Sequence, residues 1–391
     1  MIRDTLLLVT TSYPQAGDGS EAAGGFVADL AQELARQLPV RVVAPGSSAG
    51  ATHTADDLSV TRFASPGRPL SLLSPLRPGD WLPILATLRS LREQTLLADA
   101  DGRVAHVLAL WTLPSGWAAA ALKRAHGTPY SVWALGSDIW TLSRMPLLRA
   151  LLRQVVQGAT HRYADGLQLS KDAARIAGLP FEFLPSTRSL EGGRARPLAS
   201  EPPYRLLFLG RWHPNKGIDL LLEALALLDE NAWARIVEVR IAGGGPLDAL
   251  VRERVAALQA RGHPIRLDGF LDRTQAADAI ANADWLLIPS RIESIPVVFS
   301  DAMKLGCPVI ATAVGDLPEL VTADPACGII AASATPAALE AAISTALLEP
   351  PRSFQKGVER AAKAFDIATV VARILAAVRI PVQQVSNNGH D

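Results

Sequence analysis

The sequence has few cysteines and no long apolar run. Its two cysteines, Cys307 and Cys327, cannot form the disulfide framework of a small secreted domain. No apolar run reaches the roughly 18–20 residues that a membrane-spanning helix needs. The N-terminal stretch MIRDTLLLVTTSYP has too short an apolar core for a signal peptide and is typical of a first strand. These absences predict a cytoplasmic protein, either free or at the inner face of a membrane.

An excess of charge of one sign is also absent. The 391 residues carry 38 Lys/Arg and 38 Asp/Glu, so the net charge is zero, and the basic balance typical of nucleic-acid-binding proteins is missing. We therefore expect no nucleic-acid partner. Residues 1–198 hold 20 basic and 16 acidic side chains, and the remainder holds 18 and 22. The first half, with four more basic than acidic groups (20 − 16), is the half expected to meet an acidic acceptor or a membrane surface.

What the sequence does have is an apolar content of 49%, arranged in alternating strand-like and helical runs. The run Leu6–Thr10 is strand-like and Phe26–Leu38 is helical, and this alternation predicts an α/β fold with parallel sheets. The pattern dissolves into Gly, Pro, Arg and Ser at Glu191–Pro203 and starts afresh at Arg205–Leu209. We therefore expect two Rossmann-like, doubly wound domains facing a cleft, at residues 1–195 and 204–365. Residues 366–391 form a last helix, for which packing back on the first domain is expected, and a tail.

The most informative stretch is RLLFLGRWHPNKGIDLLLEA, which starts at Arg205. An apolar strand ends near Gly210, and Arg211 and Lys216 follow just before a helix. The free N–H groups at a helix start, together with two cations, suit an anionic ligand held through its phosphates. The alternative is a solvated Arg/Lys turn, which this stretch alone does not exclude.

Two further stretches share this logic. The run IAGGGP ends a strand in three glycines, and Gly244 would let a ligand approach the backbone closely. In PSRIESIPVVFSDAMKLGCPVIAT, Glu293 lies on a loop and Asp301 on the following helix, and both carboxylates could grip sugar hydroxyls. The amides of Ser294 and Ile295 at the helix start would add phosphate contacts. Surface loop and helix positions are the alternative for both carboxylates.

Together these motifs resemble the second domain of the family 4 retaining glycosyltransferases (glycosyl transferases group 1), which have the GT-B fold. The match covers most of Arg205–Val321. The resemblance implies that Arg211 and Lys216 bind the diphosphate of a nucleotide-sugar donor and that Glu293 lies near the donor sugar; these three are the expected catalytic residues. The second carboxylate of the family's pair, which grips the ribose, falls on Asp301 and is one methylene shorter.

The first half resembles the family less closely. EAAGGFVADLAQELARQL is similar to the family's glycine-rich loop and first helix, which implies that Gly24 and Gly25 face the donor phosphates; a plain helix start is the alternative. Gly136, Ser137 and Asp138 fall where the family has a His-Gly-Ser-Asp turn on the acceptor side.

Two leucines replace family histidines in this half. Leu135 stands in the place of the histidine of that turn, and Leu110 stands in the place of an earlier one. A leucine can neither donate nor accept a hydrogen bond, so the donor contact that the family's histidine makes must come from elsewhere.

Asp99 and Asp101 spell the D-x-D of metal-dependent glycosyltransferases, but they follow a polar stretch, which favours a solvated loop. The seven histidines have no ligand-like spacing, so we expect no metal site and no cofactor. The nucleotide-diphosphate-sugar is then a substrate.

The stretch SRMPLLRALLRQVVQGATHR, from Ser143, carries arginines and no acid, and its apolar residues recur at helical spacing. Such a helix is compatible with peripheral contact with an anionic bilayer; packing on the first sheet is the alternative.

The sequence thus predicts a retaining, metal-independent glycosyltransferase that moves a sugar to a glycan, lipid-linked or small-molecule acceptor, in polysaccharide or glycolipid assembly. Two other classes remain. A non-catalytic nucleotide-sugar-binding or scaffold protein would keep the phosphate contacts and lose the histidines. A dinucleotide-dependent oxidoreductase would need G-x-G-x-x-G after the first strand, where TSYPQAGDGS stands instead.

Overall fold

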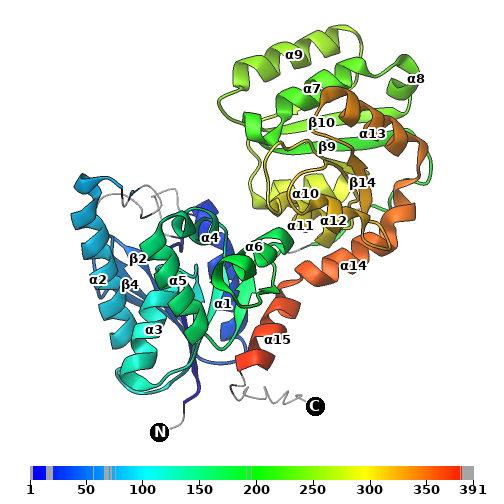
Figure 1. The fold of residues 1–391 in the computed structure, drawn as a ribbon. Helices are drawn as coiled ribbons and strands as arrows, with labels where there is room; N and C mark the ends of the chain where they lie inside the picture. The colour runs from blue at the N-terminus through cyan, green and yellow to red at the C-terminus, as the bar shows by residue number, and fades with distance from the viewer. Residues whose placement is uncertain are drawn as a thin grey trace, which may run out of the picture. The chain divides into compact units, whose positions relative to one another are not determined.

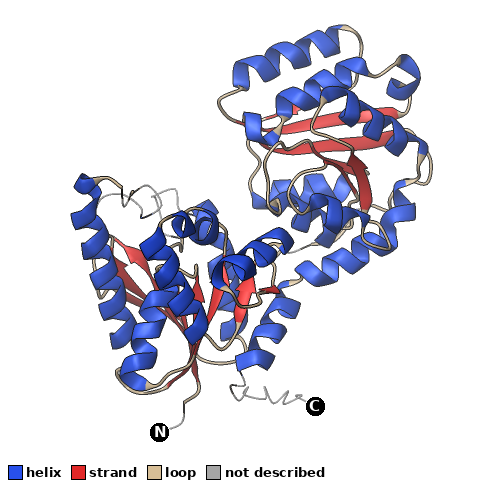
Figure 2. Cartoon of the chain, in the orientation of Figure 1, coloured by secondary structure: helices blue, strands red, loops and turns tan. Residues whose placement is uncertain are grey.

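The computed structural model describes residues 3–14, 21–55, 57–65, 70, 73–74, 76–190, 192–194, 196–378 and 380. The chain divides into two compact units: unit 1 is Met1–Ser189 with Ile367–Asp391, and unit 2 is Leu190–Asp366. Each unit is built on a largely parallel sheet with helices on both faces (Figures 1 and 2). The predicted α/β class is therefore confirmed.

Unit 1 has strands in the order β3-β4-β2-β1-β5-β6-β7-β8, with β3 and β4 antiparallel and the other neighbours parallel. The strands are β1 (Thr5–Val9), β2 (Val40–Gly46), β3 (Thr52–Ala55), β4 (Leu58–Ala64), β5 (Val104–Leu110), β6 (Tyr130–Ala134), β7 (Arg162–Ala164) and β8 (Glu182–Phe183). The helices are α1 (Glu21–Ala35), α2 (Trp81–Leu97), α3 (Ser115–His126), α4 (Ser137–Trp140), α5 (Pro146–Gly158), α6 (Leu167–Ala177) and α15 (Ile367–Val378), with the short helices η2 (Pro78–Asp80) and η3 (Leu142–Arg144).

The central strand of unit 1 shows why the sheet is covered on both faces. Successive side chains of a strand point to opposite faces, and in β1 the four side chains from Leu6 to Val9 are all apolar and fully buried. Leu7 and Val9 pack into the core shared with α2, α3, α5 and α6. Leu6 and Leu8 pack into the core shared with α1 and α15. The last helix of the chain thus lies beside α1 in unit 1.

Unit 2 has an all-parallel sheet in the order β11-β10-β9-β12-β13-β14. Its strands are β9 (Tyr204–Arg211), β10 (Ile236–Gly244), β11 (Ile265–Asp268), β12 (Trp285–Ile288), β13 (Val309–Thr312) and β14 (Gly328–Ala331). Its helices are α7 (Ile218–Leu227), α8 (Glu230–Trp233), α9 (Asp248–Ala260), α10 (Arg273–Asn282), α11 (Val297–Lys304), α12 (Leu317–Thr322), α13 (Pro336–Leu348) and α14 (Gln355–Phe365), with η4 (Pro214–Lys216) and η5 (Pro351–Phe354).

The strand order of unit 2 reverses direction between β9 and β12. From β9 the chain moves outward to β10 and β11, and it then returns to β12 on the other side of β9 before continuing to β13 and β14. In doubly wound sheets the crevice at such a switch point, beyond the carboxyl ends of the strands, is the usual ligand site. The loops that follow β9 and β12 are therefore the place to look for function in unit 2.

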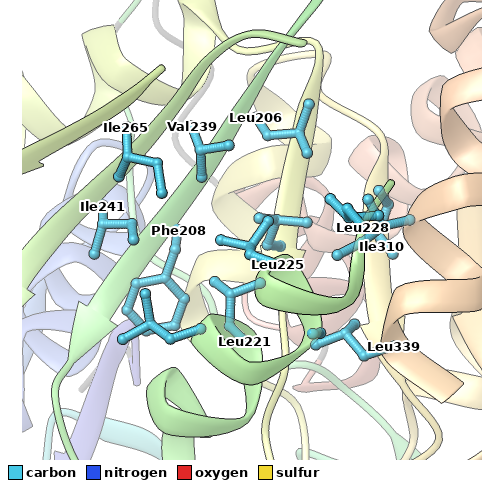
Figure 3. Close-up of a cluster of buried hydrophobic side chains, with 14 of the residues drawn as sticks. Leu206, Phe208, Leu221, Leu225, Leu228, Val239, Ile241, Ile265, Ile310 and Leu339 are labelled. Atoms are coloured by element: carbon cyan, nitrogen blue, oxygen red, sulfur yellow. The ribbon is translucent and has the colours of Figure 1, made fainter. Parts of the chain in front are cut away.

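The core of unit 2 fixes the helix that follows β9. Leu206 and Phe208 of β9 pack against Leu221 and Leu225 of α7, and all four side chains are buried (Figure 3). Burying a leucine or phenylalanine side chain contributes about 1.5–3 kcal/mol. The start of α7, and with it the residues just before Ile218, is therefore held firmly against the sheet.

Candidate active site

The turn between β9 and α7 approaches the end of β12 very closely. Gly217 has φ 67° and is the N-cap residue of α7. A Cβ atom at this position would lie 1.8 Å from the carbonyl oxygen of Pro289, the residue that follows β12. Only glycine fits here, because the backbone conformation is left-handed and the space for a side chain is occupied. This contact brings the two loops of the switch point together.

Lys216 and Glu293, one from each loop, form an ion pair. The Nζ of Lys216 donates a hydrogen bond to Oε1 of Glu293, and the hydroxyl of Ser290 donates to the same oxygen at 3.2 Å. Both ionic side chains are partly buried and line a pocket of about 250 Å³. Lys216 has two further N–H bonds to offer and Glu293 has a second oxygen. The pair can therefore contact an anion and a hydroxyl group side by side.

The rest of this pocket is largely apolar. Its wall includes Phe208 and Gly210 from β9 and Leu287 from β12, and Ile295 and Val297 come from the start of α11. Sites that bind small molecules usually have a mostly apolar wall with a few polar groups. The backbone amides at the start of α11, an eight-residue helix, point their free N–H groups outward from the helix end.

The backbone of Glu293 and Ser294 packs against the loop that follows β13. Gly315 has φ 55°, and a Cβ atom there would lie 2.2 Å from the carbonyl oxygen of Glu293. The amide of Asp316 donates to the carbonyl oxygen of Ser294 at 3.1 Å. The loop that carries the carboxylate is thus fixed by a second close backbone approach.

Arg211 lies at the exposed end of β9, outside the wall of this pocket. It stands opposite Gly244 in the register of β9 and β10, and the amide of Trp212 donates to the carbonyl oxygen of Gly244 at 2.9 Å. Gly243 has φ 147°, and a Cβ atom there would lie 2.0 Å from the carbonyl oxygen of Gly210. The glycine run therefore allows β10 to approach β9 closely. Because residues 243–245 are all glycines, they place no side chain in the space beside Arg211.

Asp301 is placed differently from the residues above. Its side chain is buried on α11, and Nζ of Lys304 lies 3.9 Å from its Oδ1. Asp301 is not part of the wall of the Lys216–Glu293 pocket. Contact between this carboxylate and a ribose stays a prediction.

Gly24 and Gly25 lie inside α1 and not in a loop. Gly24 packs so closely on the preceding chain that a Cβ atom would lie 2.6 Å from the backbone of Tyr13, whereas the position of Gly25 is open. Residues 15–20, which precede this helix, lie outside the described residues. Close packing accounts for Gly24, and a donor contact through either glycine stays a prediction.

The Gly136–Asp138 turn is organised by the buried carboxylate of Asp138. Its Oδ2 accepts the amide of Thr112 at 2.6 Å, and its Oδ1 accepts the amides of Leu135 and Gly136 at 3.2 and 3.0 Å. Burial raises the pKa of this carboxyl, while the hydrogen bonds from the amides of Thr112 and Leu135 act in the opposite direction. Asp138 thus ties the loop after β5 to the loop after β6, and its side chain faces the protein interior. It is a positioning residue, while Ser137 opens the short helix α4.

The two aspartates of the D-x-D sequence take part in structural contacts. Asp99 is buried and accepts hydrogen bonds from the amide of Val104 at 3.0 Å and from Thr128 at 3.1 Å. Asp101 pairs with Arg41, and this partner lowers the pKa of Asp101 to about 2. Among the described residues, no three His, Cys, Asp or Glu side chains gather closely enough to hold a metal ion. Within the same residues, no helix is both long and apolar enough to cross a membrane.

One contact that joins the two loops of the switch point could not be predicted from the motifs. Arg291 donates to Oδ1 and Oδ2 of Asp219 at 2.7 and 2.9 Å, and it also donates to the carbonyl oxygen of Pro214 at 2.8 Å. Burial alone would raise the pKa of Asp219, but the Arg291 guanidinium holds it below its usual range. The loops that carry Lys216 and Glu293 are thus bridged a second time, away from the pocket.

Comparison with known proteins shows which proteins the part of the chain that holds this site is similar to. Residues 203–349 match the model of glycosyl transferases group 1, which confirms the resemblance predicted from the motifs. The chain is 32% identical over 210 residues to D-inositol 3-phosphate glycosyltransferase of Geodermatophilus obscurus, covering 52% of this chain and 46% of that protein. It is 26% identical over 247 residues to the putative teichuronic acid biosynthesis glycosyltransferase TuaC of Bacillus subtilis, covering 60% and 58%. The matches span about half the length of these relatives.

Solved structures resemble the chain over nearly its whole length. Sucrose-phosphate synthase from Thermosynechococcus elongatus has a TM-score of 0.68 at 18% identity, with 96% of this chain and 98% of that chain covered. HepE from Anabaena, solved in complex with UDP-glucose, has a TM-score of 0.63 at 16% identity, with 96% and 100% covered. At this level of identity the likeness concerns the fold, and it confirms the predicted GT-B architecture.

Proposed function

We propose that this chain, whose residues 203–349 belong to glycosyl transferases group 1, is a retaining glycosyltransferase that uses a nucleotide-diphosphate-sugar. The observation that carries the proposal is the Lys216–Glu293 pair in a pocket at the switch point of unit 2. A cation and a carboxylate side by side at this place suit a ligand that is anionic at one end and hydroxylated at the other. A UDP-glucose complex of a protein with the same fold supports a donor of this class.

The proposed reaction exchanges one bond at the anomeric carbon for another on the same face. The bond between this carbon and the diphosphate oxygen breaks, and the electron pair leaves with the diphosphate. The acceptor hydroxyl forms the new bond, and its proton passes to the departing phosphate oxygen, so no protein base is needed. The main requirement is stabilisation of negative charge on the leaving group, together with orientation of the two reactants.

The roles of the residues follow from their positions. Lys216 would neutralise the departing diphosphate, and the amides of Ser294 and Ile295, in the loop just before α11, would add hydrogen bonds. Arg211, exposed at the end of β9, would reach the same phosphates from the other side. Glu293, held by Ser290, would orient the sugar and stabilise positive charge at its ring. No step requires a protein-bound metal or another cofactor, so the reaction is proposed to be metal-independent.

The acceptor and the setting belong to the proposal as well. Glycan, lipid-linked and small-molecule acceptors all fit a group 1 enzyme, and TuaC is named as a putative teichuronic acid biosynthesis enzyme. A role in polysaccharide or glycolipid assembly, in the cytoplasm or at the inner face of the membrane, is therefore proposed. Gly136 and Ser137, in the turn that Asp138 fixes, are the acceptor-side candidates.

The test uses the full chain and a panel of UDP-, GDP- and ADP-sugars. Calorimetry is expected to show binding of one donor class, and transfer or slow donor hydrolysis is expected with the same class. NMR of the product should show the anomeric configuration of the donor. Inversion at that carbon would refute the retaining assignment, and the absence of binding by every donor would refute the donor site.

A second candidate is a non-catalytic nucleotide-sugar-binding protein with the same fold. Leu110 and Leu135, which stand where the family has histidines, favour it, because neither can contact the reacting centre through a hydrogen bond. Such a protein would give a calorimetric signal with its nucleotide-sugar but neither transfer nor hydrolysis.

A further inference from the structure

An apolar pocket of about 160 Å³ opens in unit 1 between α2, α3 and α5. These helices lie side by side on one face of the sheet (Figure 1). The wall includes Ile84, Leu88, Trp117, Leu142, Leu148 and Leu151. Apart from the indole of Trp117, these side chains have no group that could bind a sugar or a nucleotide through a hydrogen bond. The pocket is suited to a hydrocarbon chain.

Large apolar side chains next to this pocket are exposed to solvent. Trp81 and Leu85 are 54% and 62% exposed, and they share one face of α2 with Ile84 and Leu88. Leu147 is 85% exposed and lies one helical turn before Leu151 on α5. Single exposed leucines are ordinary, but a group of them that extends an apolar pocket marks a binding surface. We call the pocket with Trp81, Leu85 and Leu147 the apolar face.

The charge around the apolar face is mainly positive. Residues 76–97 and 139–158, which include α2 and α5, contain six arginines and two acids, Asp80 and Glu93. Asp80 is buried, and its Oδ2 accepts the amide of Ser74 at 2.9 Å. Arg77 and Arg144, next to the starts of α2 and α5, are exposed. Leucine and tryptophan beside exposed arginines are the composition of surfaces that bind anionic bilayers. A second copy of the chain would bring like charges together at the same surface, which opposes self-association.

The apolar face also lies next to the acceptor-side turn. The pocket wall includes Leu113, and the amide of the preceding residue, Thr112, is held by Asp138 at 2.6 Å. A chain bound in this pocket would therefore place its polar end near the loops after β5 and β6. Such a geometry serves a lipid whose headgroup, and not its chain, is the reacting part.

We propose that the apolar face docks on an anionic bilayer and that the pocket takes a hydrocarbon chain of a lipid-linked acceptor. The acceptor role rests on the proposed function, whereas docking on the bilayer does not. The exposed apolar side chains enter the hydrocarbon boundary, and the arginines bind the lipid phosphates.

Co-sedimentation with vesicles tests the docking. The full chain should bind vesicles that contain phosphatidylglycerol, release them as salt is raised, and bind pure phosphatidylcholine vesicles at least tenfold more weakly. The double variant Leu85→Asp/Leu147→Asp should lose at least tenfold in affinity. The matched control is Leu227→Asp/Leu348→Asp, which changes two leucines of unit 2 that are 57% and 69% exposed and should bind like the unchanged chain.

A second measurement concerns the pocket itself. Phosphatidylglycerol with brominated acyl chains should quench tryptophan fluorescence, because Trp117 lines the pocket and Trp81 stands at its rim. Trp117→Phe should lose part of this quenching while vesicle binding is retained. Unchanged quenching in both Trp117→Phe and Trp81→Phe would show that no lipid chain reaches the apolar face.

The outcomes separate this inference from the proposed function. Lys216→Ala should abolish sugar transfer and leave vesicle binding unchanged, and Leu85→Asp/Leu147→Asp should leave calorimetric donor binding unchanged. Donor binding without vesicle binding, or equal vesicle binding by the double variant, overturns the docking. A dimer that the double variant dissociates would show that a second copy covers this face and would overturn it too. Vesicle binding without donor binding leaves the docking intact and removes the acceptor role.

Discussion

Arg291 and Asp219 form a bidentate ion pair between the loop that carries Glu293 and the first turn of α7, which follows Lys216. Nη1 and Nη2 of Arg291 lie 2.7 and 2.9 Å from the two carboxylate oxygens of Asp219. Arg291 stands two residues before Glu293, and Asp219 stands three residues after Lys216. A planar guanidinium that binds both oxygens fixes direction as well as distance. This pair therefore holds the distance between Lys216 and Glu293 without contacting the pocket.

We expect Arg291→Ala to act on the reaction through geometry. The turnover number should fall about tenfold, which corresponds to about 1.4 kcal/mol, and donor affinity should fall less than turnover. The free energy of unfolding should fall by only about 0.5–1 kcal/mol, because the pair is partly exposed. Steady-state kinetics and urea unfolding measure the two effects separately.

The control for this prediction is a double-mutant cycle. Asp219→Asn should produce a similar loss, and Arg291→Ala/Asp219→Asn should cost little more than either single change, because both remove the same bridge. Arg252→Ala, which breaks an exposed Arg–Asp pair within α9, should leave turnover unchanged. Additive losses in the cycle would contradict a joint role.

Lys216→Ala should lower turnover by about a hundredfold or more. Removal of a single group that stabilises the departing charge costs on the order of 2–4 kcal/mol of transition-state stabilisation. The fold should survive, because Lys216 is partly exposed and its backbone conformation does not depend on the side chain. Lys356→Ala, at an exposed position of α14, is the control and should keep normal turnover. Full activity of Lys216→Ala would show that the diphosphate binds elsewhere.

The sequence predicted elements best where strands are continuously apolar. The expected strand at Leu6–Thr10 is β1, shifted by one residue, and β9 starts one residue before the expected Arg205. Buried parallel strands read as unbroken apolar runs, so the signal is strong there. The strand β3, Thr52–Ala55, is exposed along its length and carries no such run. It was missed because only its pairing with β4 makes it a strand.

Short motifs in the sequence identified two of the residues that come together at the switch point. Lys216 and Glu293 line one pocket, and their binding of a common ligand stays a prediction. The Arg291–Asp219 ion pair joins residues 72 positions apart, and no motif around either residue predicts their contact. The burial of a side chain could not be predicted either. The sequence does not distinguish an aspartate that faces a substrate from one that, like Asp138, accepts hydrogen bonds from three backbone amides.

Gly217→Ala should destabilise unit 2 strongly. The new Cβ would lie 1.8 Å from the carbonyl oxygen of Pro289, so the turn between β9 and α7 or the end of β12 must move. A left-handed conformation alone costs alanine about 1–2 kcal/mol, and we expect a total loss above about 3 kcal/mol in urea unfolding.

Gly262→Ala separates these two causes. Gly262 also has a left-handed conformation, with φ 88°, but the space around its Cβ position is open. Its replacement should cost only the strain of about 1–2 kcal/mol. Equal losses for the two variants would mean that the approach of Gly217 to Pro289 is not tight.

Both cysteines should be unreactive in the folded protein. Burial raises the pKa of Cys307 to about 12 and that of Cys327 to about 11, and the thiolate is the reactive form. At pH 8, a thiol reagent should therefore label neither cysteine in native protein and both in urea. Fast labelling under native conditions would show that unit 2 opens locally around β13.

Asp138→Asn tests whether the carboxylate positions the two loops of unit 1. Asp138 accepts amides on both oxygens, and asparagine has only one accepting oxygen. Its NH₂ group must then face an N–H group at the amide of Thr112 or at those of Leu135 and Gly136. Leaving a buried donor unsatisfied costs about 1–3 kcal/mol, and the loss should appear in urea unfolding. The acceptor KM should rise while the donor Kd, measured by calorimetry, stays constant, because the proposed donor site lies in unit 2. Ser137→Ala, next to it in α4, should leave stability nearly unchanged, and a stable Asp138→Asn protein with an unaltered acceptor KM would remove Asp138 from this role.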